Sequence, residues 1–362
     1  MKILGIESSC DETAAAVVED GFRLLSNVVV SQIDIHKEYG GVVPEVAARS
    51  HIEAINPVIK EALVKSGCEW QDIDAIAVTY APGLVGSLLV GSLAARTLAI
   101  VHDKPLYAIH HVEAHTYANF ITEQPSGELT LPAKQPEFPM LALIVSGGHT
   151  QLVLFRAHGD YELLGQTQDD AVGEAYDKVA KIIGLPYPGG PSISKAAKLG
   201  DPNRYNLPKA KLKNPFDFSF SGLKTATLRT AQAEVGADFR LPSHEIADRL
   251  TETQRSDFAA SFQKVANETL VDKTVAAFNQ FNPTSVVIAG GVAANNNLRE
   301  QLAARLMIDI YYAPIQLCTD NAAMIASLGY YHAQVHKPAD PYDFEILPSL
   351  SMTDKFHIKA LQ

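Results

Sequence analysis

The chain has 362 residues, more than one hydrophobic core usually holds, so two domains or lobes are expected. Hydrophobic residues make up 47% of the chain and charged residues 20%, which is typical of a globular enzyme with ample core. The net charge of −11 argues against a nucleic-acid partner, because neutralising phosphates needs a basic surface.

The cysteines and the apolar segments indicate in which cellular compartment the protein works. Cys10, Cys68 and Cys318 are too few and too widely separated for a disulfide framework, and they fit a reducing cytosol. The chain opens directly on a strand-like segment, and no apolar run approaches the length of a membrane span. The sequence therefore predicts a soluble cytoplasmic protein.

The first elements are a hairpin and a helix. Residues 2–7 and 12–19 alternate as two strands around a polar turn that ends at Asp11. Asp11 and Glu12 are turn formers with solvated charge, or they help to hold a metal-bound phosphate. Residues 45–66 have apolar positions at helical spacing, with Pro57 predicted to kink or break the helix.

A glycine-bearing turn follows the next strand. The pattern predicts a buried strand at residues 73–79, the turn at residues 81–86 and a helix rich in small side chains at residues 87–101. Such a turn and helix N-terminus can bind an anion, but close packing explains the glycines equally well.

The most specific indication of a functional site lies in residues 108–115, where a strand is predicted to end and a helix to begin. If the helix begins near His111, then His111 and His115 share one face with their Cβ atoms about 5–6 Å apart. One divalent metal fits between the two imidazoles. The alternative is that one histidine caps the helix while the other fills a polar niche. Glu113 points away from that face, so the base of a zinc protease is missing.

The second half of the chain opens as the first does. Residues 122–139 are predicted as a surface loop or lobe boundary. Strands at 140–145 and 149–155 then flank a Ser146-Gly-Gly148 turn, which repeats the first hairpin. Two hairpins, each opening about half of the chain, predict an internally duplicated architecture.

The segments that follow carry candidate ligand contacts. A helix at 169–184 holds Asp177, and the glycine-proline turn at 187–191 can offer bare N–H groups to a ligand. Residues 207–224 interleave lysines with three phenylalanines, a pattern that stacked bases use, although buried rings under a solvated lysine face are at least equally expected.

The last elements include a second glycine junction. A long helix at 256–280 and a strand at 284–289 lead into Gly290-Gly291 and a helix at 297–306, a junction suited to a nucleotide. Asp320 stands at the start of a helix that runs to about His332. It is either a helix cap or a third metal ligand.

Taken together, these turns are typical of the two-lobed α/β fold of actin, the heat-shock chaperone ATPases and the sugar kinases, in which a nucleotide lies in a cleft between duplicated lobes. We expect lobe I to comprise residues 1–135 and about 323–362, and lobe II to comprise 136–322.

The sequence also resembles the tRNA N6-adenosine threonylcarbamoyltransferase family. The motifs that carry the resemblance fall in family order along nearly the whole chain: residues 5–13, 41–45, 81–86, 111–115, 145–150, 173–178, 187–191, 218–224, 290–295 and 319–321.

The resemblance implies a set of site residues. It implies that His111, His115 and Asp320 bind one divalent metal, usually Fe²⁺, with Zn²⁺ or Mn²⁺ also compatible. It further implies that an adenylate-bearing substrate is held by Ile144, Val145, Ser146, Gly147, Gly148, Asp177, Gly190 and Asn295. Glu12 and Lys224 are candidates for proton handling or charge stabilisation, with His149 a weaker one.

The reaction implied is metal-assisted transfer of a threonylcarbamoyl group from threonylcarbamoyl-AMP to N6 of adenosine 37, next to the anticodon, in tRNAs that read codons beginning with A. Implied partners are tRNA, a paralogous subunit of the same fold, a small ATPase and a separate synthase that supplies threonylcarbamoyl-AMP. Lysines between Lys195 and Lys224 are a candidate tRNA patch despite the net charge. The alternatives are an ATP-dependent small-molecule kinase of the same fold and a non-catalytic nucleotide-sensing scaffold.

Overall fold

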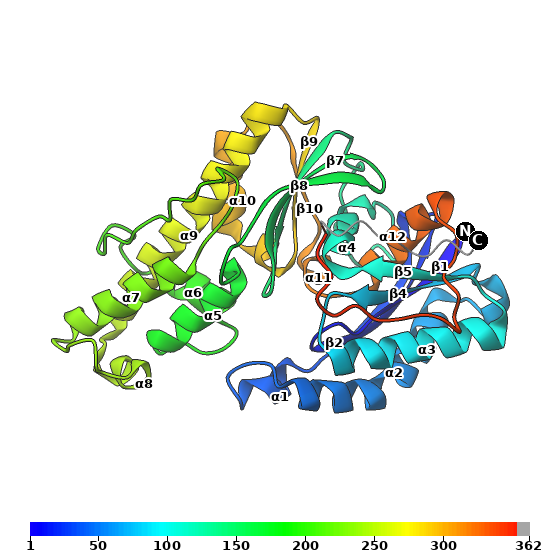
Figure 1. Ribbon diagram of the computed structural model, residues 1–362, viewed down its shortest axis with the longest axis horizontal. Coiled ribbons are helices and arrows are strands. Elements are labelled where there is room, and N and C mark those ends of the chain that lie inside the picture. Colours follow the sequence, from blue (N-terminus) through cyan, green and yellow to red (C-terminus); the bar gives the residue numbers. More distant parts are fainter. Residues whose placement is uncertain (353–362) are drawn as a thin grey trace. The chain divides into compact units, whose positions relative to one another are not determined.

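The computed structural model describes residues 1–352 as a mixed α/β chain with two five-stranded sheets (Figure 1). The chain folds as two compact units. Within the described residues, unit 1 comprises Met1–Glu137, Arg156–Tyr161 and residues 311–352, and unit 2 comprises Phe138–Phe155 and Glu162–Ile310. This division differs from the expected lobes mainly at residues 311–322, which belong to unit 1.

The sheet of unit 1 is built around the first strand of the chain. Its order is β3-β2-β1-β4-β5, with β1 antiparallel to β2 and parallel to β4, and β4 parallel to β5. The strands are β1 (Lys2–Glu7), β2 (Glu12–Glu19), β3 (Arg23–Ser31), β4 (Ala75–Ala81) and β5 (Leu106–His110). The predicted hairpin is confirmed at both of its strands.

Helices cover both faces of this sheet. On one face, α2 and α3 pack on β2 and β4, and on the other face α12 packs on β1. The helices of unit 1 are α1 (Ile33–Lys37), α2 (Pro44–Ser66), α3 (Val85–His102), α4 (His111–Tyr117), α11 (Ile315–Cys318) and α12 (Ala322–Val335), with short 3₁₀ turns at Trp70–Asp72 and Ala118–Phe120. Pro57 lies inside α2 without ending it, so of the predicted kink or break the break is absent.

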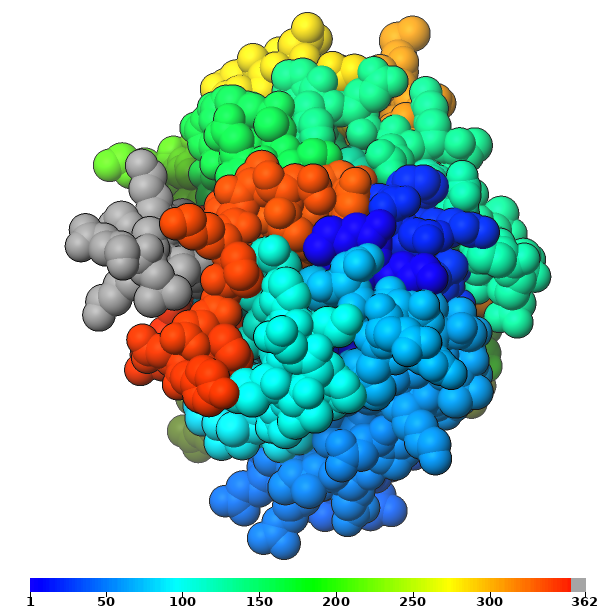
Figure 2. All heavy atoms as spheres, turned by 90° about the vertical axis from the view of Figure 1, so that its right-hand side faces the viewer, coloured from blue at the N-terminus to red at the C-terminus, as the bar shows by residue number. Residues whose placement is uncertain are grey.

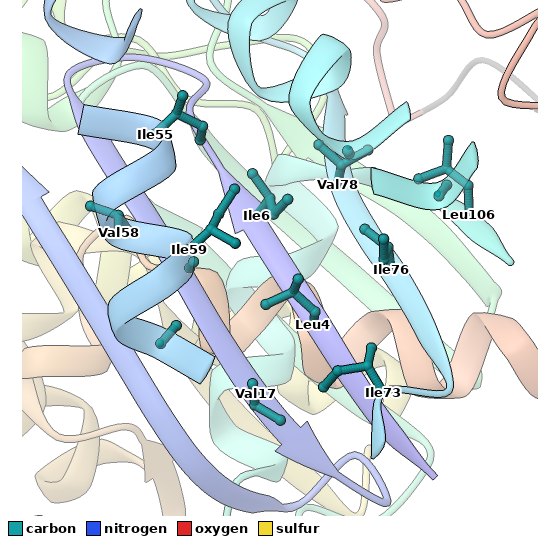
Figure 3. Close-up of a cluster of buried hydrophobic side chains, with 14 of the residues drawn as sticks. Leu4, Ile6, Val17, Ile55, Val58, Ile59, Ile73, Ile76, Val78 and Leu106 are labelled. Carbon is teal, nitrogen blue, oxygen red and sulfur yellow. The ribbon is translucent and has the colours of Figure 1, made fainter. Parts of the chain in front are cut away.

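The core of unit 1 forms where α2 meets the sheet. Ile55, Val58 and Ile59 of α2 cluster with Leu4 and Ile6 of β1 (Figure 3). Alternate side chains of a strand point to opposite faces, so Gly5 between them faces α12. A Cβ at Gly5 would lie 2.4 Å from the carbonyl oxygen of Ala322. The helix therefore packs directly on the strand backbone.

An apolar run of membrane-spanning length does exist, contrary to the expectation. By length and composition α3 (Val85–His102) passes as a membrane helix. One such helix is a weak indication, because a helix packed on a sheet passes the same test, and α3 packs on α2 and β4. Arg96 of α3 also donates hydrogen bonds to the carbonyl oxygens of Pro341, Tyr342 and Phe344, so α3 (cyan) and this segment (orange to red) lie side by side in Figure 2.

The sheet of unit 2 repeats the first. Its order is β10-β9-β6-β7-β8, with β6 antiparallel to β7 and parallel to β9. The strands are β6 (Met140–Val145), β7 (Thr150–Ala157), β8 (Asp160–Gln166), β9 (Ser285–Ala289) and β10 (Ile310–Tyr312). Strands β6 to β10 take the places that β1 to β5 take in unit 1, which confirms the predicted duplication.

The helices of unit 2 lie mainly between β8 and β9 in the sequence. They are α5 (Val172–Ile182), α6 (Gly189–Ala197), α7 (Ser221–Glu234), α8 (Ser243–Ile246), α9 (Glu252–Phe281) and α10 (Asn296–Arg305), with 3₁₀ turns at Ala247–Arg249 and Gly291–Ala294. The long helix α9 packs on α6 and α10. Three turns hold the candidate substrate contacts. The turn at residues 146–148 lies beside the N-terminal end of α5, and those at residues 187–191 and 290–295 lead into α6 and α10.

Candidate functional site

Two histidines and one aspartate meet at the N-terminal end of α4. This helix begins at His111, as expected, directly after β5. The rings of His111 and His115 have centroids 4.7 Å apart. Asp320 Oδ1 lies 3.5 Å from His111 Nε2 and 3.4 Å from His115 Nε2. One ligand atom from each residue falls within 4.8 Å of the others, which is an arrangement that can hold one metal ion.

The aspartate in this group is not a helix cap. The N-cap of α12 is Asn321, whose side-chain oxygen accepts from the Met324 N–H at 3.2 Å. Asp320, one residue earlier, has its carboxylate on the two histidines. Of the two roles that its position allowed, the structure therefore excludes the cap.

The buried imidazole of His115 lacks hydrogen bonds. Its side chain is 1% exposed, and neither ring nitrogen has a hydrogen-bond partner within residues 1–352, although the Asp320 carboxylate lies near Nε2. Leaving a buried polar group unsatisfied costs about 1–3 kcal/mol. A metal ion at Nε2 relieves that cost for one of the two nitrogens, so the donor set fits a divalent cation of the Fe²⁺, Zn²⁺ or Mn²⁺ type.

A second carboxylate, Glu7, lies behind His111. Glu7 is fully buried at the end of β1, and its Oε2 is 3.1 Å from His111 Nδ1. Because β1, β4 and β5 are parallel, their carboxyl ends meet at one sheet edge, and Thr79 of β4 also donates to Glu7 Oε2 there. Glu7 was not among the residues predicted for the site, and its one signal in the sequence was its place at the end of a predicted strand.

The charges of these groups shift their pKa values. Burial lowers the pKa of His111, but the carboxylates of Asp320 and Glu7 outweigh it and raise the pKa to about 9. Burial raises the pKa of Glu7, yet the facing His111 lowers it overall. In the metal-free protein the two groups therefore form a buried ion pair at neutral pH.

Glu12 at the start of β2 is the predicted proton-handling residue of unit 1. Burial, together with the negative charges of Asp320 and Asp11, raises the pKa of Glu12 to about 10. Ser31 Oγ donates to its Oε1 at 3.0 Å. A carboxyl group with this pKa keeps its proton at neutral pH and can donate it.

In unit 2 the predicted substrate turn is held from both sides. Ser146 N–H donates to the His149 carbonyl oxygen at 2.8 Å, which closes the turn between β6 and β7. Gly173 and Gly290 pack directly against this turn. A Cβ at Gly173 would lie 2.5 Å from the carbonyl oxygen of Ser146, and a Cβ at Gly290 would lie 2.4 Å from the carbonyl oxygen of Val145. Gly290 also has a φ of +89°, which favours glycine.

The turn exposes backbone and few side chains. Gly147 and Gly148 leave open space around them, because a Cβ at either position would meet no atom within 4 Å. Ile144 and Val145 are fully buried in β6. Both residues are 0% exposed, main chain included, so the open part of the turn is at Gly147 and Gly148.

Asp177 fixes the start of the next helix. Its Oδ1 accepts the N–H of Gly189, at the start of α6, at 2.6 Å. A Cβ at Gly189 would lie 2.5 Å from the Asp177 Cα, whereas Gly190 has open space beside it. The predicted residues Asp177 and Gly190 thus stand at one helix N-terminus, which attracts anions.

Asn295 is engaged in a polar network. Its Oδ1 caps α10 by accepting from Leu298 N–H at 3.2 Å, and its Nδ2 is 3.4 Å from Tyr176 Oη and 3.3 Å from Gln263 Oε1. Tyr176 in turn donates to Asn267 Oδ1 at 3.0 Å. The side chain is held rigidly at the end of the β9 junction.

Lys224 lies in unit 2, whereas Glu12 lies in unit 1. The Lys224 ammonium is 2.8 Å from Asp170 Oδ2, and Lys178 binds the other oxygen of the same carboxylate at 2.9 Å. Burial raises the pKa of Asp170, but these two lysines lower it overall. The Lys224 charge is therefore already balanced within unit 2.

The interleaved phenylalanines are core residues. Phe216, Phe218 and Phe220 are buried, so they offer no stacking platform for bases, and of the two interpretations the buried one is correct. Lys209 is also paired, with Glu268 at 2.8 Å and Asp272 at 2.9 Å. Lys211 and Lys213 remain as exposed cations of this segment.

Comparison with known proteins gives consistent matches. The family model for tRNA N6-adenosine threonylcarbamoyltransferase matches residues 23–327. A protein of that name from Symbiobacterium thermophilum is 53% identical over 91% of each chain, and one from Thermomicrobium roseum is 49% identical over 99% of each chain. Among solved structures, full-length HypF in its phosphate- and nucleotide-bound form is 13% identical with a TM-score of 0.56, covering 92% of this chain and 55% of that one. With the two matching sheets, this likeness confirms the predicted fold class.

Proposed function

The chain belongs to the tRNA N6-adenosine threonylcarbamoyltransferase family, whose members form threonylcarbamoyladenosine in tRNA, and from this premise we propose the donor, the acceptor and the residues of the reaction. The donor is threonylcarbamoyl-AMP, and the acceptor is N6 of the adenosine next to the anticodon in tRNAs that read codons beginning with A. The small-molecule kinase of the same fold is set aside, because the family match covers most of the chain.

The metal centre is formed by His111, His115 and Asp320. The observation that carries it is His115, an imidazole 1% exposed without a hydrogen-bond partner among the described residues, 3.4 Å from a carboxylate. We propose Fe²⁺ as the resident ion, while the same ligands suit Zn²⁺ or Mn²⁺. When bound, such an ion polarises a carbonyl or phosphoryl oxygen as a Lewis acid and orients the AMP leaving group.

The acceptor needs an activated donor. The exocyclic amine of adenine is a poor nucleophile because its lone pair is delocalised into the ring, so the protein acts mainly on the carbamoyl group. Glu12 holds a proton at neutral pH, which suits it to give that proton to the departing phosphate oxygen and to take up in turn the proton that N6 loses. Lys224 is the weaker candidate for charge stabilisation, since Asp170 already neutralises it.

The adenylate-bearing substrate binds unit 2. The open space at Gly147, Gly148 and Gly190 admits phosphate oxygens to N–H groups. Asp177 is suited to accept a hydrogen bond from a ribose or threonyl hydroxyl. Asn295 is suited to hydrogen-bond the sugar or the base with the donor or acceptor positions that its own network leaves unused.

Partners complete the activity. We propose a paralogous subunit of the same fold, a small ATPase and a separate synthase that supplies the donor, all in the cytoplasm. The exposed apolar side chains on α3 support a protein partner there: Val85, Leu89, Leu93, Ile100 and Val101. Exposed apolar stripes of this kind mark interaction surfaces.

The test is modification of a tRNA transcript that reads a codon beginning with A, using threonine, bicarbonate, ATP and the partner proteins. Nucleoside mass spectrometry compares wild type with His111→Ala/His115→Ala. We expect wild type to form threonylcarbamoyladenosine and the double variant to form it at least roughly a hundredfold more slowly. The reason is that removing a catalytic metal removes several kcal/mol of charge stabilisation.

A matched control is His102→Ala/His244→Ala, two histidines outside the site. It is expected to modify tRNA as wild type does. Full modification by the His111/His115 variant contradicts the metal proposal, whereas an absence of product with wild type and active partners contradicts the choice of donor or acceptor.

A further inference from the structure

Glu7 has no part in the proposed function, yet it is a completely buried carboxylate beside the site. It is 0% exposed at the end of β1. Burying a carboxylate is costly unless strong partners satisfy it. A side chain kept there as an anion therefore needs an explanation in its contacts.

Three groups from separate segments converge on this carboxylate. Ser9 N–H donates to Oε1 at 2.5 Å, Thr79 Oγ1 donates to Oε2, and His111 Nδ1 lies 3.1 Å from Oε2. The carboxylate is thus fixed by the first hairpin turn and by β4 before it meets the histidine. It forms a rigid support for the ring and not a flexible counter-ion.

The hydrogen-bond chemistry sets the state of His111. An ionised carboxylate only accepts hydrogen bonds, so the proton between the two groups sits on Nδ1 of His111. The other ring nitrogen, Nε2, faces Asp320 Oδ1 at 3.5 Å, and once it gives up its own proton it offers the lone pair that a metal needs. Ser9 Oγ, 3.2 Å from Nδ1, is a second acceptor on the same side of the ring.

We infer that Glu7 is a positioning residue for the metal centre: it fixes the Nδ1–H form of His111, sets the plane of the ring and makes Nε2 a stronger donor. A carboxylate behind a metal-bound histidine generally acts in this way. This inference rests on the proposed metal site, since it concerns the affinity of that site for its ion.

The test uses Co²⁺ as the probe, because its visible absorption bands report both binding and coordination geometry. Glu7→Gln keeps the shape of the side chain and removes the charge. We expect Co²⁺ to bind about 10–100-fold more weakly than to wild type, with altered bands, while the circular dichroism spectrum shows that the variant keeps the wild-type fold.

Glu113→Gln is the matched control. Glu113 is also a buried carboxylate of unit 1 and lies on α4 itself, but its Oε1 is 3.9 Å from His332 Nε2 and not on a metal ligand. We expect this variant to bind Co²⁺ as wild type does. A second readout is ¹⁵N NMR of the Zn²⁺-loaded wild type, in which His111 is expected to show a protonated Nδ1 and a metal-bound Nε2.

The outcomes separate this inference from the metal proposal. If wild type binds no Co²⁺, the metal site itself is overturned, and the inference falls with it. If wild type binds and Glu7→Gln binds equally well, or both glutamine variants weaken binding to the same extent, only the role of Glu7 is overturned. A metal-bound Nδ1 in the NMR spectrum also overturns it, whatever the variants do.

Discussion

His111 is the residue at which the charges of the site meet, because its two ring nitrogens face different carboxylates. Nδ1 is 3.1 Å from Glu7 and Nε2 is 3.5 Å from Asp320. Burial opposes a charge on the ring, yet the two carboxylates raise its pKa to about 9. In the metal-free protein the site therefore carries a proton at the nitrogen that we propose as a metal ligand.

Metal binding should release that proton. At pH 7, below the His111 pKa of about 9, the ring is protonated, and the ion has to displace close to one proton. The apparent affinity is then expected to rise about tenfold per pH unit up to the pKa and to level off above it. Calorimetric titration at pH 7 in two buffers of different ionisation enthalpy measures the proton count. A count near zero contradicts the ion pair described here.

Glu12 gives a prediction for stability. Its pKa in the folded protein is about 10 against an ordinary value of 4.5, so its ionisation favours unfolding. The stability that the neutral form provides is complete below about pH 4.5 and is lost as pH rises toward 10. Glu12→Gln, which stays neutral, should therefore lose less thermal stability than wild type as the pH rises from about 5 to about 8.

Thermal unfolding of the metal-free proteins checks this, with Glu61→Gln on the exposed face of α2 as control. Equal loss of melting temperature in wild type and Glu12→Gln would show that the carboxyl ionises freely.

At the scale of elements, the packing of α12 on β1 decides where Asp320 lies. Gly5 lets the helix pack on the strand backbone, because a Cβ at that position would lie 2.4 Å from the Ala322 oxygen. Asp320 immediately precedes α12, while the two histidines come from α4 after β5. A shift of α12 therefore moves one proposed metal ligand relative to the other two.

Gly5→Ala tests this packing. The added methyl group has backbone atoms in its place, so we expect a loss of about 1–3 kcal/mol in the free energy of unfolding and weaker metal binding. Gly222→Ala is the control, because Gly222 lies in α7 with open space around it and alanine is the better helix former. Chemical denaturation measures both, and equal stability of the two variants contradicts the account.

The exposed face of α3 gives a second prediction at this scale. Leu93 is 48% exposed, so Leu93→Glu should fold normally but weaken association with the proposed same-fold partner roughly tenfold or more. Sedimentation velocity of the mixture measures the effect. Leu199→Glu, an exposed leucine of unit 2, is the control and is expected to associate as wild type does. Unchanged association of the Leu93 variant assigns the partner to another surface.

At the scale of the whole molecule, the chain carries a net charge of −11. A tRNA partner must then meet local groups of cations. In the segment before α7 the aromatic rings are buried and Lys209 is paired, which leaves Lys211 and Lys213 exposed for this purpose. Any tRNA contact there is electrostatic and not based on stacking.

Lys211→Glu/Lys213→Glu should therefore weaken tRNA binding and reduce the slope of log affinity against log salt by roughly 0.7–0.9 for each phosphate that the variant no longer neutralises. Filter binding at several salt concentrations measures the slope. Lys60→Glu/Lys65→Glu on α2 makes the same change in net charge as a control. If both variants behave alike, net charge alone explains the effect and the patch does not exist.

The sequence by itself determined the local elements and the chemical types at the site. Alternation indicated both strands of the first hairpin, and four-residue spacing placed His111 and His115 on one helix face, because these patterns depend on neighbours along the chain. The repeat of a hairpin also indicated the duplicated fold. These features require no knowledge of which segments meet.

Only the tertiary structure decided which residues meet and which side chains are buried. It placed Asp320 on the histidines and gave the cap to Asn321, brought Glu7 behind His111, and buried Phe218 in the core. Each of these outcomes depends on contacts between segments distant in sequence. Such contacts are set by how strands pair and how α12 packs on β1, which local spacing does not encode.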